Sequence, residues 1–280
     1  MHIDPMEKKP LFHFHPGDRV LSLGSVGCNL RCAHCQNWQI SQARVEDLPL
    51  IELRPEEVVK MCKREGCGGV AWTYNEPTIW HEYAFDSSKL AKENGLYTVY
   101  VTNGFIKEAP LREMATVLDA MNIDVKAFTE DFYRKITRSR LAPVLRTAEV
   151  AHELGVHVEL TYLIIPTLND TPEEIAGFSA WVRDSLSVDV PVHFTRFHPD
   201  YKLDHLPPTP LETLEMAASR AKDAGLRFVY LGNVLTAEGE DTRCPECGAL
   251  VLERSGFNVR KREYRDGRCS RCGAGLNIVP

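Results

Sequence analysis

Between about residues 18 and 231 of this 280-residue chain, strand-like runs alternate with longer helix-like segments. In chain order the strand candidates are Arg19–Leu23, Gly69–Thr73, Tyr97–Thr102, Met121–Lys126, Val156–Ile165, Val192–Phe197 and Arg227–Leu231. Apolar residues recur at helical spacing between them, as in Pro55–Glu65 and Pro172–Leu186. Repeated strand–helix units need crossover connections, which bring successive strands together in parallel. The alternation therefore predicts a parallel sheet, either open or closed.

The distribution of polar side chains along the strands distinguishes between these two forms. Polar residues share one face on Thr98, Tyr100 and Thr102 of the third strand, Asn122, Asp124 and Lys126 of the fourth, and His157, Glu159 and Thr161 of the fifth. A parallel strand covered by helices on both faces would be almost continuously apolar. Unpaired charges in a dry core are costly, so these faces should look into a polar interior. We therefore predict an α/β fold, a partial (β/α)6 TIM-like barrel open on one side, with its chemistry at the C-terminal ends of the strands.

Three parts of the chain differ in character. Residues 1–17 form an N-terminal extension, residues 18–235 the barrel, and residues 236–280 a linker with a small cysteine-rich module. The first five residues, Met1–Pro5, precede a second methionine and are left out of the predicted fold. We expect the polar run 236–243 to separate the core of the module from the core of the barrel.

Composition limits the classes of partner. The chain has 33 Lys and Arg against 39 Asp and Glu, a net charge of −6, so nucleic acid is not the expected partner. No apolar run approaches the roughly 20 residues that a spanning helix needs, and the N-terminus does not resemble a secretory signal. We expect a soluble, cytoplasmic protein without a membrane partner.

Nine cysteines, an odd number, do not suggest a disulfide framework. Three of them form Cys28-Asn-Leu-Arg-Cys32-Ala-His-Cys35, directly after the first strand. Three thiolates this close can hold three irons of a [4Fe–4S] cluster and leave the fourth iron open. An open coordination position is typical of a catalytic metal. The alternatives are a structural three-cysteine metal site and thiols that cluster by chance.

This cysteine spacing resembles the signature of the radical S-adenosylmethionine (SAM) superfamily over roughly residues 18–235. The longer segment Cys28–Asn37 is similar to the glycyl-radical-enzyme activases, typified by pyruvate formate-lyase activating enzyme. Residues Trp38–Ser41 and the C-terminal cysteines are closer still to the radical SAM member of the AmmeMemoRadiSam system. The resemblance implies that the open iron chelates the amino and carboxylate groups of SAM. Reductive cleavage would then release a 5′-deoxyadenosyl radical that abstracts hydrogen from a substrate.

The same resemblance assigns residues to SAM. They are His34, Asn37, Glu76, Thr102, Asn103, Asp124, Lys126 and His198. Two departures from the activase pattern stand out: Tyr74-Asn-Glu-Pro77 lacks the family's glycine pair, and Val101 replaces an aspartate that helps to hold a monovalent cation there. Structural alternatives are an exposed loop glutamate at 76, a buried ion pair without a ligand at 124 and 126, and a histidine without a role at 198.

Four further cysteines, Cys244, Cys247, Cys269 and Cys272, form two C-x2-C pairs, each followed by glycine. Two such pairs can deliver four thiolates in a tetrahedron, which is typical of a closed structural zinc site. We therefore predict that the small C-terminal module is zinc-ribbon-like. A rubredoxin-like iron would use the same ligands. The basic run Arg260–Arg265 could touch RNA, but interrupting acidic residues favour a solvent-exposed strand face.

The sequence thus predicts a radical SAM enzyme whose nearest described activity is that of a glycyl-radical-enzyme activase, with a glycine of a partner protein as the hydrogen donor. The alternatives are radical modification of a small molecule, of another protein residue or of RNA, and a non-enzymatic iron–sulfur sensor or electron carrier. No cysteine-rich ferredoxin insert follows Cys35, so we expect an external one-electron reductant of the flavodoxin or ferredoxin type. Beyond the cluster, the sequence identifies no catalytic residue.

Overall fold

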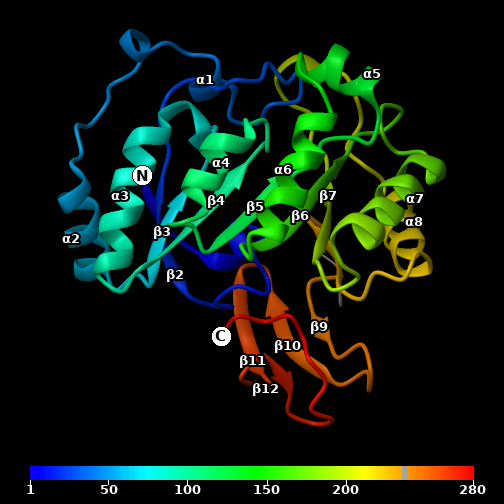
Figure 1. Ribbon diagram of the computed structural model, residues 1–280. Coiled ribbons are helices and arrows are strands. Elements are labelled where there is room, and N and C mark those ends of the chain that lie inside the picture. The colour runs from blue at the N-terminus through cyan, green and yellow to red at the C-terminus, as the bar shows by residue number, and fades with distance from the viewer. Residues whose placement is uncertain (235–238) are drawn as a thin grey trace.

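A computed structural model describes residues 1–234 and 239–280 (Figure 1). The predicted boundary between barrel and linker, at residues 235 and 236, lies outside the described residues. Eight strands form one sheet in the order of the chain: β1 (His2–Pro5), β2 (Arg19–Leu23), β3 (Gly69–Trp72), β4 (Tyr97–Thr102), β5 (Ala120–Asp124), β6 (His157–Ile164), β7 (Val192–Arg196) and β8 (Val229–Gly232). Strands β2 to β8 are parallel, as predicted. Because β1 and β8 are the two edges of the sheet, the barrel is open on one side.

Helices connect successive strands and cover the outside of the curved sheet (Figure 1). They are α1 (Trp38–Ser41), α2 (Pro55–Glu65), α3 (His81–Glu93), α4 (Glu108–Met114), α5 (Glu130–Phe132), α6 (Ala142–Glu153), α7 (Pro172–Trp181) and α8 (Leu211–Asp223). The predicted helix over 172–186 is present, with its last turn wound as a π-helix from Val182 to Leu186. Among the described residues, no helix is long and apolar enough to cross a membrane.

The N-terminal segment belongs to the fold, and leaving Met1–Pro5 out of it was wrong. β1 pairs antiparallel with β2, with His2 opposite Ser22 and Pro5 opposite Arg19. The chain then passes across the N-terminal ends of the parallel strands. There Met6, Leu11 and Phe14 pack with inward-facing Val20, Ala71, Val99 and Ala120. The segment therefore fills the lower half of the barrel interior.

The predicted polar interior is confirmed on β5 and β6 but wrong on β4. The strand register places Val101 beside Asn122 and Asn122 beside Glu159, so these three residues share the inner face. Tyr100 points outward and packs in the core between the sheet and its helices. Thr98 also faces outward, where its hydroxyl donates to the Val117 carbonyl at 2.5 Å. Period-two alternation separates two faces of a strand, but it does not say which one looks inward.

Glu159 is the buried charge of the lower interior. Its carboxylate accepts hydrogen bonds from the backbone N–H groups of Phe12 (2.9 Å) and His13 (2.7 Å). The ring Nε2 atoms of His157 and His193 lie at 3.1 and 2.7 Å from the same carboxylate. Burial alone would raise the pKa of Glu159, but the hydrogen bonds from His157 and His193 hold it below its usual range. The sequence assigns this polar face to a ligand. Part of its hydrogen-bonding capacity is instead taken up by the protein's own N-terminal segment.

The C-terminal module packs against the barrel at the end opposite α1 and α5 (Figure 1). Its strands are β9 (Thr242–Arg243), β10 (Leu250–Ser255), β11 (Asn258–Arg262), β12 (Tyr264–Arg265) and β13 (Arg268–Cys269). The expectation of two separate cores is wrong, because Phe12, Phe228 and Tyr230 of the barrel pack in one cluster with Val251 and Leu276 of the module. A polar linker does not prevent two apolar surfaces from meeting.

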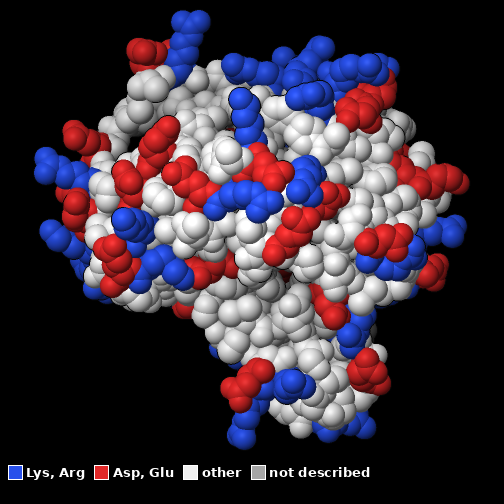
Figure 2. Space-filling view, viewed as in Figure 1, with Lys and Arg blue, Asp and Glu red and all other residues white. Residues whose placement is uncertain are grey.

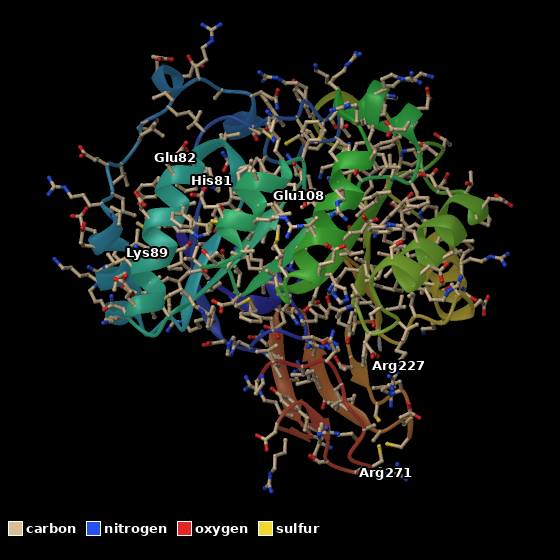
Figure 3. The ribbon with its side chains drawn as sticks, in the orientation of Figure 1. His81, Glu82, Lys89, Glu108, Arg227 and Arg271 are labelled. Atoms are coloured by element: carbon tan, nitrogen blue, oxygen red, sulfur yellow. The ribbon has the colours of Figure 1, made fainter. Side chains whose placement is uncertain are left out.

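Ion pairs reinforce this junction. Arg227, labelled between the two parts in Figure 3, contacts Asp189 of the barrel at 2.9 Å and Glu246 of the module at 2.8 Å. Arg254 of β10 is buried and reaches across to the N-terminal segment. Its guanidinium donates to the Phe12 carbonyl at 2.6 Å, stacks over the Phe12 ring at 4.2 Å, and lies 3.6 Å from the carboxylate of buried Glu7.

Replacing Arg254 with methionine tests this junction, because the change keeps much of the packing volume and removes the charge. Breaking a buried ion pair should lower the free energy of unfolding by about 3–5 kcal/mol. The matched control is Arg260→Met on exposed β11, where a surface change should cost about 0.5 kcal/mol or less. Urea unfolding followed by circular dichroism measures both variants. Equal stability of the two would contradict the role given to Arg254.

Candidate active site and metal centres

A cavity of about 530 Å³ opens at the C-terminal ends of the parallel strands. Cys28, Cys32 and Cys35 line it. So do all the residues that the sequence assigns to SAM except His198, namely His34, Asn37, Glu76, Thr102, Asn103, Asp124 and Lys126. The fold therefore gathers these residues from the ends of β3, β4 and β5 and from the cysteine loop around one space.

The cysteine loop runs from β2 to α1 and is held in place by Asn75. The side-chain amide of Asn75 donates to the Gly27 carbonyl at 2.8 Å, and its oxygen accepts from the Ser25 N–H at 3.0 Å. Gly27 has φ +95°, a conformation that glycine adopts without strain. Asn75 was not predicted as a site residue. The sequence did contain a clue, because Asn75 lies in Tyr74-Asn-Glu-Pro77, where the family's glycine pair is missing.

The three loop cysteines fit a multi-iron cluster better than a single ion. Four thiolates around one zinc lie about 3.8 Å apart, given Zn–S bonds of about 2.3 Å. Among the described residues, the sulfurs of this loop do not form a group within 4.8 Å of one another. Burial raises the pKa of the Cys32 thiol to about 12, so a thiolate there needs a neighbouring cation such as iron. Sulfurs spread in this way can each bind a different iron of a [4Fe–4S] cluster.

Glu76 is fully buried, so the alternative of an exposed loop glutamate is wrong. Its carboxylate accepts from the backbone N–H and hydroxyl of Thr78, from the Thr102 hydroxyl at 2.7 Å and from the Asn103 N–H at 2.8 Å. Burial raises the pKa of Glu76, and these donors oppose that rise. Glu76 ties the loop after β3 to the end of β4, and a direct contact with the SAM amino group stays a prediction.

Asp124 and Lys126 form an ion pair at the cavity wall, with Nζ and Oδ2 2.9 Å apart. The Asp124 side chain is 34% exposed, and no described group bonds its second oxygen, Oδ1. Burial would lower the pKa of Lys126, but the adjacent Asp124 carboxylate raises it above its usual range. The pair therefore places a stable cation and a partly free carboxylate beside the cysteines.

Two amides and one histidine complete the wall. The Asn103 amide donates to Asn29 Oδ1 at 2.8 Å and lies 3.6 Å from the Cys28 sulfur. Asn37 donates to the Tyr74 carbonyl at 2.7 Å. His34 is buried, its Nδ1 has no hydrogen-bond partner, and burial lowers its pKa to about 3. An unpaired buried nitrogen at a cavity wall is the kind of group that a bound ligand satisfies.

His198 follows β7 and is not among the residues that line this cavity. Its side chain is exposed, and its Nδ1 lies 2.9 Å from the Pro199 carbonyl. The structure does not bring His198 together with the other predicted SAM contacts. Its contact with the adenosine of SAM stays a prediction.

The cavity floor was not predicted from the sequence. Lys8, Lys9 and Pro10 of the N-terminal segment line it from below. Lys9 is buried, pairs with Asp4 at 2.7 Å, and lies 4.7 Å from the ring centre of Tyr74. Tyr74, in the place of a family glycine, also donates its hydroxyl to Asp4 at 2.6 Å. A long-range contact of this kind leaves no pattern in the sequence.

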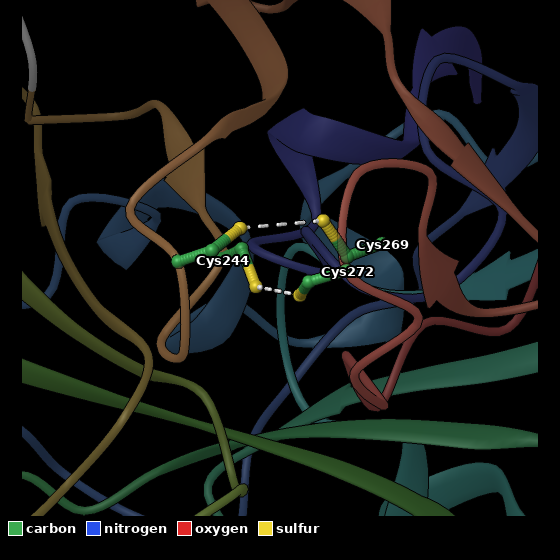
Figure 4. Close-up of side chains that lie close together, drawn as sticks. Cys244, Cys269 and Cys272 are labelled. Carbon is green, nitrogen blue, oxygen red and sulfur yellow. Dashed lines mark hydrogen bonds between the residues drawn. The ribbon is translucent and has the colours of Figure 1, made fainter.

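The C-terminal cysteines form a second, separate metal-binding group. Of the described His, Cys, Asp and Glu side chains, only these four bring ligand atoms that all lie within 4.8 Å of one another. The Cys244 and Cys272 sulfurs are 3.5 Å apart, and those of Cys247 and Cys269 are 3.8 Å apart (Figure 4). These separations match four thiolates around one tetrahedral ion. The group can therefore hold a single metal ion.

Comparison with known proteins identifies the class of enzyme. The family model of the radical SAM superfamily matches residues 23–179, more than half of the chain. The chain therefore belongs to the radical SAM superfamily, whose members use a [4Fe–4S] cluster and SAM. The matched residues include the cysteine loop and the ends of β2 to β6.

Relatives by sequence refine this assignment. An uncharacterized protein of Methanocaldococcus jannaschii is 49% identical over 99% of this chain and 83% of its own length. Pyruvate formate-lyase-activating enzyme of Clostridium pasteurianum is 27% identical over 63% of this chain and 79% of its own. Pyruvate formate-lyase 1-activating enzyme of Escherichia coli is 23% identical over 77% and 93%. The chain is thus similar to activating enzymes.

Solved structures show the same fold. A domain of pyruvate-formate lyase-activating enzyme from Bacteroides vulgatus superposes with a TM-score of 0.53, covering 59% of this chain and 99% of that domain at 16% identity. Streptococcus suis SuiB bound to S-adenosylmethionine gives a TM-score of 0.61, covering 86% of this chain and 56% of SuiB at 12% identity. These likenesses confirm the predicted radical SAM barrel.

Asp124→Asn tests the cavity wall. Replacing the carboxylate with a neutral amide should weaken SAM binding to the reconstituted protein by about tenfold or more, equivalent to about 1.4 kcal/mol. Iron and sulfide contents should stay unchanged, because Asp124 is not a cluster ligand. Asp204→Asn, an exposed carboxylate outside the cavity lining, is the control. Equilibrium dialysis with labelled SAM and thermal unfolding measure both variants, and a lower melting temperature with unchanged SAM affinity would make Asp124 a structural residue.

Proposed function

We propose that this radical SAM enzyme abstracts a hydrogen atom from a glycine of a partner protein, as an activating enzyme does. The observation that carries the proposal is the shape of the site. Lys9 and Pro10 close the cavity from below, so a substrate approaches from the mouth at the C-terminal ends of the strands. Similarity to the two activating enzymes supports the same reading.

The mouth has features that suit a peptide. Trp38, which follows the lining residue Asn37, stacks with Tyr201 with ring centres 5.2 Å apart, and Trp38 is 37% exposed. The Lys202 N–H donates to the Ala33 carbonyl at 3.1 Å, which fixes this aromatic pair beside the cysteine loop. Rigid aromatic surfaces offer large contact areas at low entropic cost. Such a rim can hold an extended loop that carries a glycine into the cavity.

A [4Fe–4S] cluster with SAM supplies the radical chemistry, and the chain's own residues supply position and charge. In this proposal Asp124 Oδ1 would be available to accept from the ammonium group of SAM, and the Lys126 ammonium would attract its carboxylate. Lys9 adds little net charge because Asp4 neutralises it. His34, Glu76 and Thr102 of the cavity wall are buried, and buried walls of this kind help to exclude water from the reacting atoms of a radical.

We also propose that the four C-terminal cysteines hold a structural zinc ion. Four thiolates leave no open position for a substrate, which is typical of a closed structural site. The ion would fix the module whose residues pack on Phe12 and Tyr230 beneath the cavity floor. A rubredoxin-like iron is the alternative that metal analysis decides.

Deuterium transfer tests the proposed substrate. A candidate glycyl radical enzyme is prepared with glycine deuterated at the α carbon and mixed anaerobically with reduced protein and SAM. The expected result is deuterium in the 5′-deoxyadenosine formed and a glycyl radical signal in electron paramagnetic resonance. Cys32→Ala should abolish both by removing a cluster ligand, whereas Cys67→Ala, outside the cavity lining, should change neither.

The outcomes separate the alternatives. 5′-Deoxyadenosine without deuterium would show that the enzyme cleaves SAM but takes hydrogen from another substrate. No 5′-deoxyadenosine from fully reconstituted protein would favour an electron carrier over an enzyme.

Removal of one C-terminal cysteine tests the second metal site. Protein purified in air should keep about one equivalent of zinc per chain, since four thiolates hold a closed site tightly. Cys269→Ala should lose this zinc and lower the unfolding temperature of the whole chain, because Cys269 packs in the core shared with the barrel. Cys67→Ala is the matched control and should keep the metal. Iron in place of zinc by elemental analysis would overturn the zinc assignment.

A further inference from the structure

Exposed basic side chains gather on the outer surface of the cysteine loop. Figure 2 shows a row of Lys and Arg along the top of the molecule, over the end that carries α1 and α5. We define the cluster-side basic patch by five exposed residues, Arg31, Arg134, Lys135, Arg138 and Arg140. The chain as a whole carries a net charge of −6, so this concentration of positive charge is local.

The patch is attached directly to the loop that holds the cysteines. The Arg31 N–H donates to the Thr137 carbonyl, and the Ala33 N–H donates to the Ile136 carbonyl, each at 2.9 Å. These two hydrogen bonds place the segment 133–140 against the outside of the loop. The basic residues of this segment therefore lie beside the backbone between Cys28 and Cys35.

Neighbouring acidic residues do not neutralise the patch. Asp131 contacts Lys135 at 2.8 Å and Arg134 at 3.5 Å, and these two basic side chains remain 70% and 75% exposed. Within the described ranges 1–234 and 239–280, Arg138 and Arg140 form no ion pair. Surface charges left without partners attract an oppositely charged molecule at a distance.

The patch does not serve the SAM cavity. None of its five residues is among those that line the cavity. A substrate must reach the space where SAM binds, whereas an electron donor needs only to approach an iron. The outer surface of the loop offers that approach, because Asn29 and Arg31 are exposed there and Cys28 is half-buried. The position of the patch therefore favours an electron donor over a substrate.

An apolar groove continues the patch. It lies between α4 and α6, has a volume of about 580 Å³, and is lined by Phe105, Leu111, Pro143 and Val150 with Arg140 at its edge. Asn29 of the cysteine loop also lines it and donates to the Phe105 carbonyl at 2.8 Å. An apolar centre with a charged rim is the usual composition of a transient protein interface.

We propose that the cluster-side basic patch and this groove form the docking surface for a one-electron carrier protein with an acidic face. Radical SAM activases need an external reductant, and charge complementarity would speed its encounter with the loop. The carrier would transfer one electron to the [4Fe–4S] cluster, so that the carrier is oxidised and the cluster reduced by one electron each, with no bond formed or broken. The residues of the patch only bind the carrier. The proposal rests on the assignment of the cluster to the cysteine loop and not on the identity of the substrate.

Charge reversal tests the surface with a binding readout that needs no activity. Isothermal titration calorimetry of an acidic flavodoxin and of an acidic ferredoxin against the reconstituted protein should give, for at least one carrier, a dissociation constant that rises with salt. Arg134→Glu with Lys135→Glu should weaken this binding by about tenfold or more. The matched control is Arg260→Glu with Lys261→Glu on the exposed β11. It makes the same charge change far from the loop and should change the dissociation constant by less than about twofold.

Two further measurements define the outcome. Carbodiimide, which joins an amine directly to a carboxylate, should cross-link Lys135 to the carrier. SAM cleavage driven by a photoreduced small deazaflavin should be equal in the patch variant and the wild type.

Wild-type protein that binds neither carrier, or binding that is unchanged in the patch variant, would overturn the proposal. A patch variant that binds the carrier normally but loses a partner protein or RNA would also overturn it and assign the surface to that molecule. Deuterium transfer from glycine can fail without affecting any of these results.

Discussion

The carboxylate of Glu159 is the constraint on which the rest of the site depends. A charge at this depth in the barrel needs several hydrogen-bond donors, because the cost of burying it unpaired would exceed the free energy of unfolding of a typical domain. Two of its donors are the backbone N–H groups of Phe12 and His13, which precede it by 147 and 146 residues in the sequence. Glu159 therefore fixes the N-terminal segment across the interior, and Lys9 and Pro10 of that segment become the cavity floor. The position of the floor follows from this one buried charge.

The same segment links the floor to the C-terminal module. His13 Nε2 lies 2.5 Å from the Tyr230 hydroxyl, which lies 2.8 Å from the Thr242 hydroxyl. Arg254 donates to Thr242 and to the Phe12 carbonyl, so the network returns to the segment where it began. The module is thus part of the support of the cavity. A metal ion held by the four C-terminal cysteines would act on the cavity through this packing and these hydrogen bonds, although its site lies at the other end of the barrel.

Short-range sequence patterns, namely strand alternation and cysteine spacing, predicted the features that depend on residues close together in the sequence. Alternation put Asp124 on the face opposite Ile123, and the cost of burying an unpaired charge in an apolar core indicated that this face looks inward. The two metal-binding groups followed from cysteine spacing. The inward assignment of Tyr100 failed because a tyrosine can bury its ring in an apolar core as readily as in a polar interior. The shared core of the module depends on contacts across more than two hundred residues, such as Phe12 with Leu276. No short-range pattern encodes such contacts.

The loop from Cys28 to Cys35 has two surfaces with different surroundings. Its inner surface faces Asp124, Lys126 and the cavity floor, where acidic and basic side chains are paired. Its outer surface meets the segment 133–140, where positive charge is in excess and open to solvent. A ligand of mixed charge such as SAM suits the first environment, and a large acidic partner suits the second. Because the loop backbone separates them, substitutions at the mouth can change the substrate while the outer surface keeps its charge.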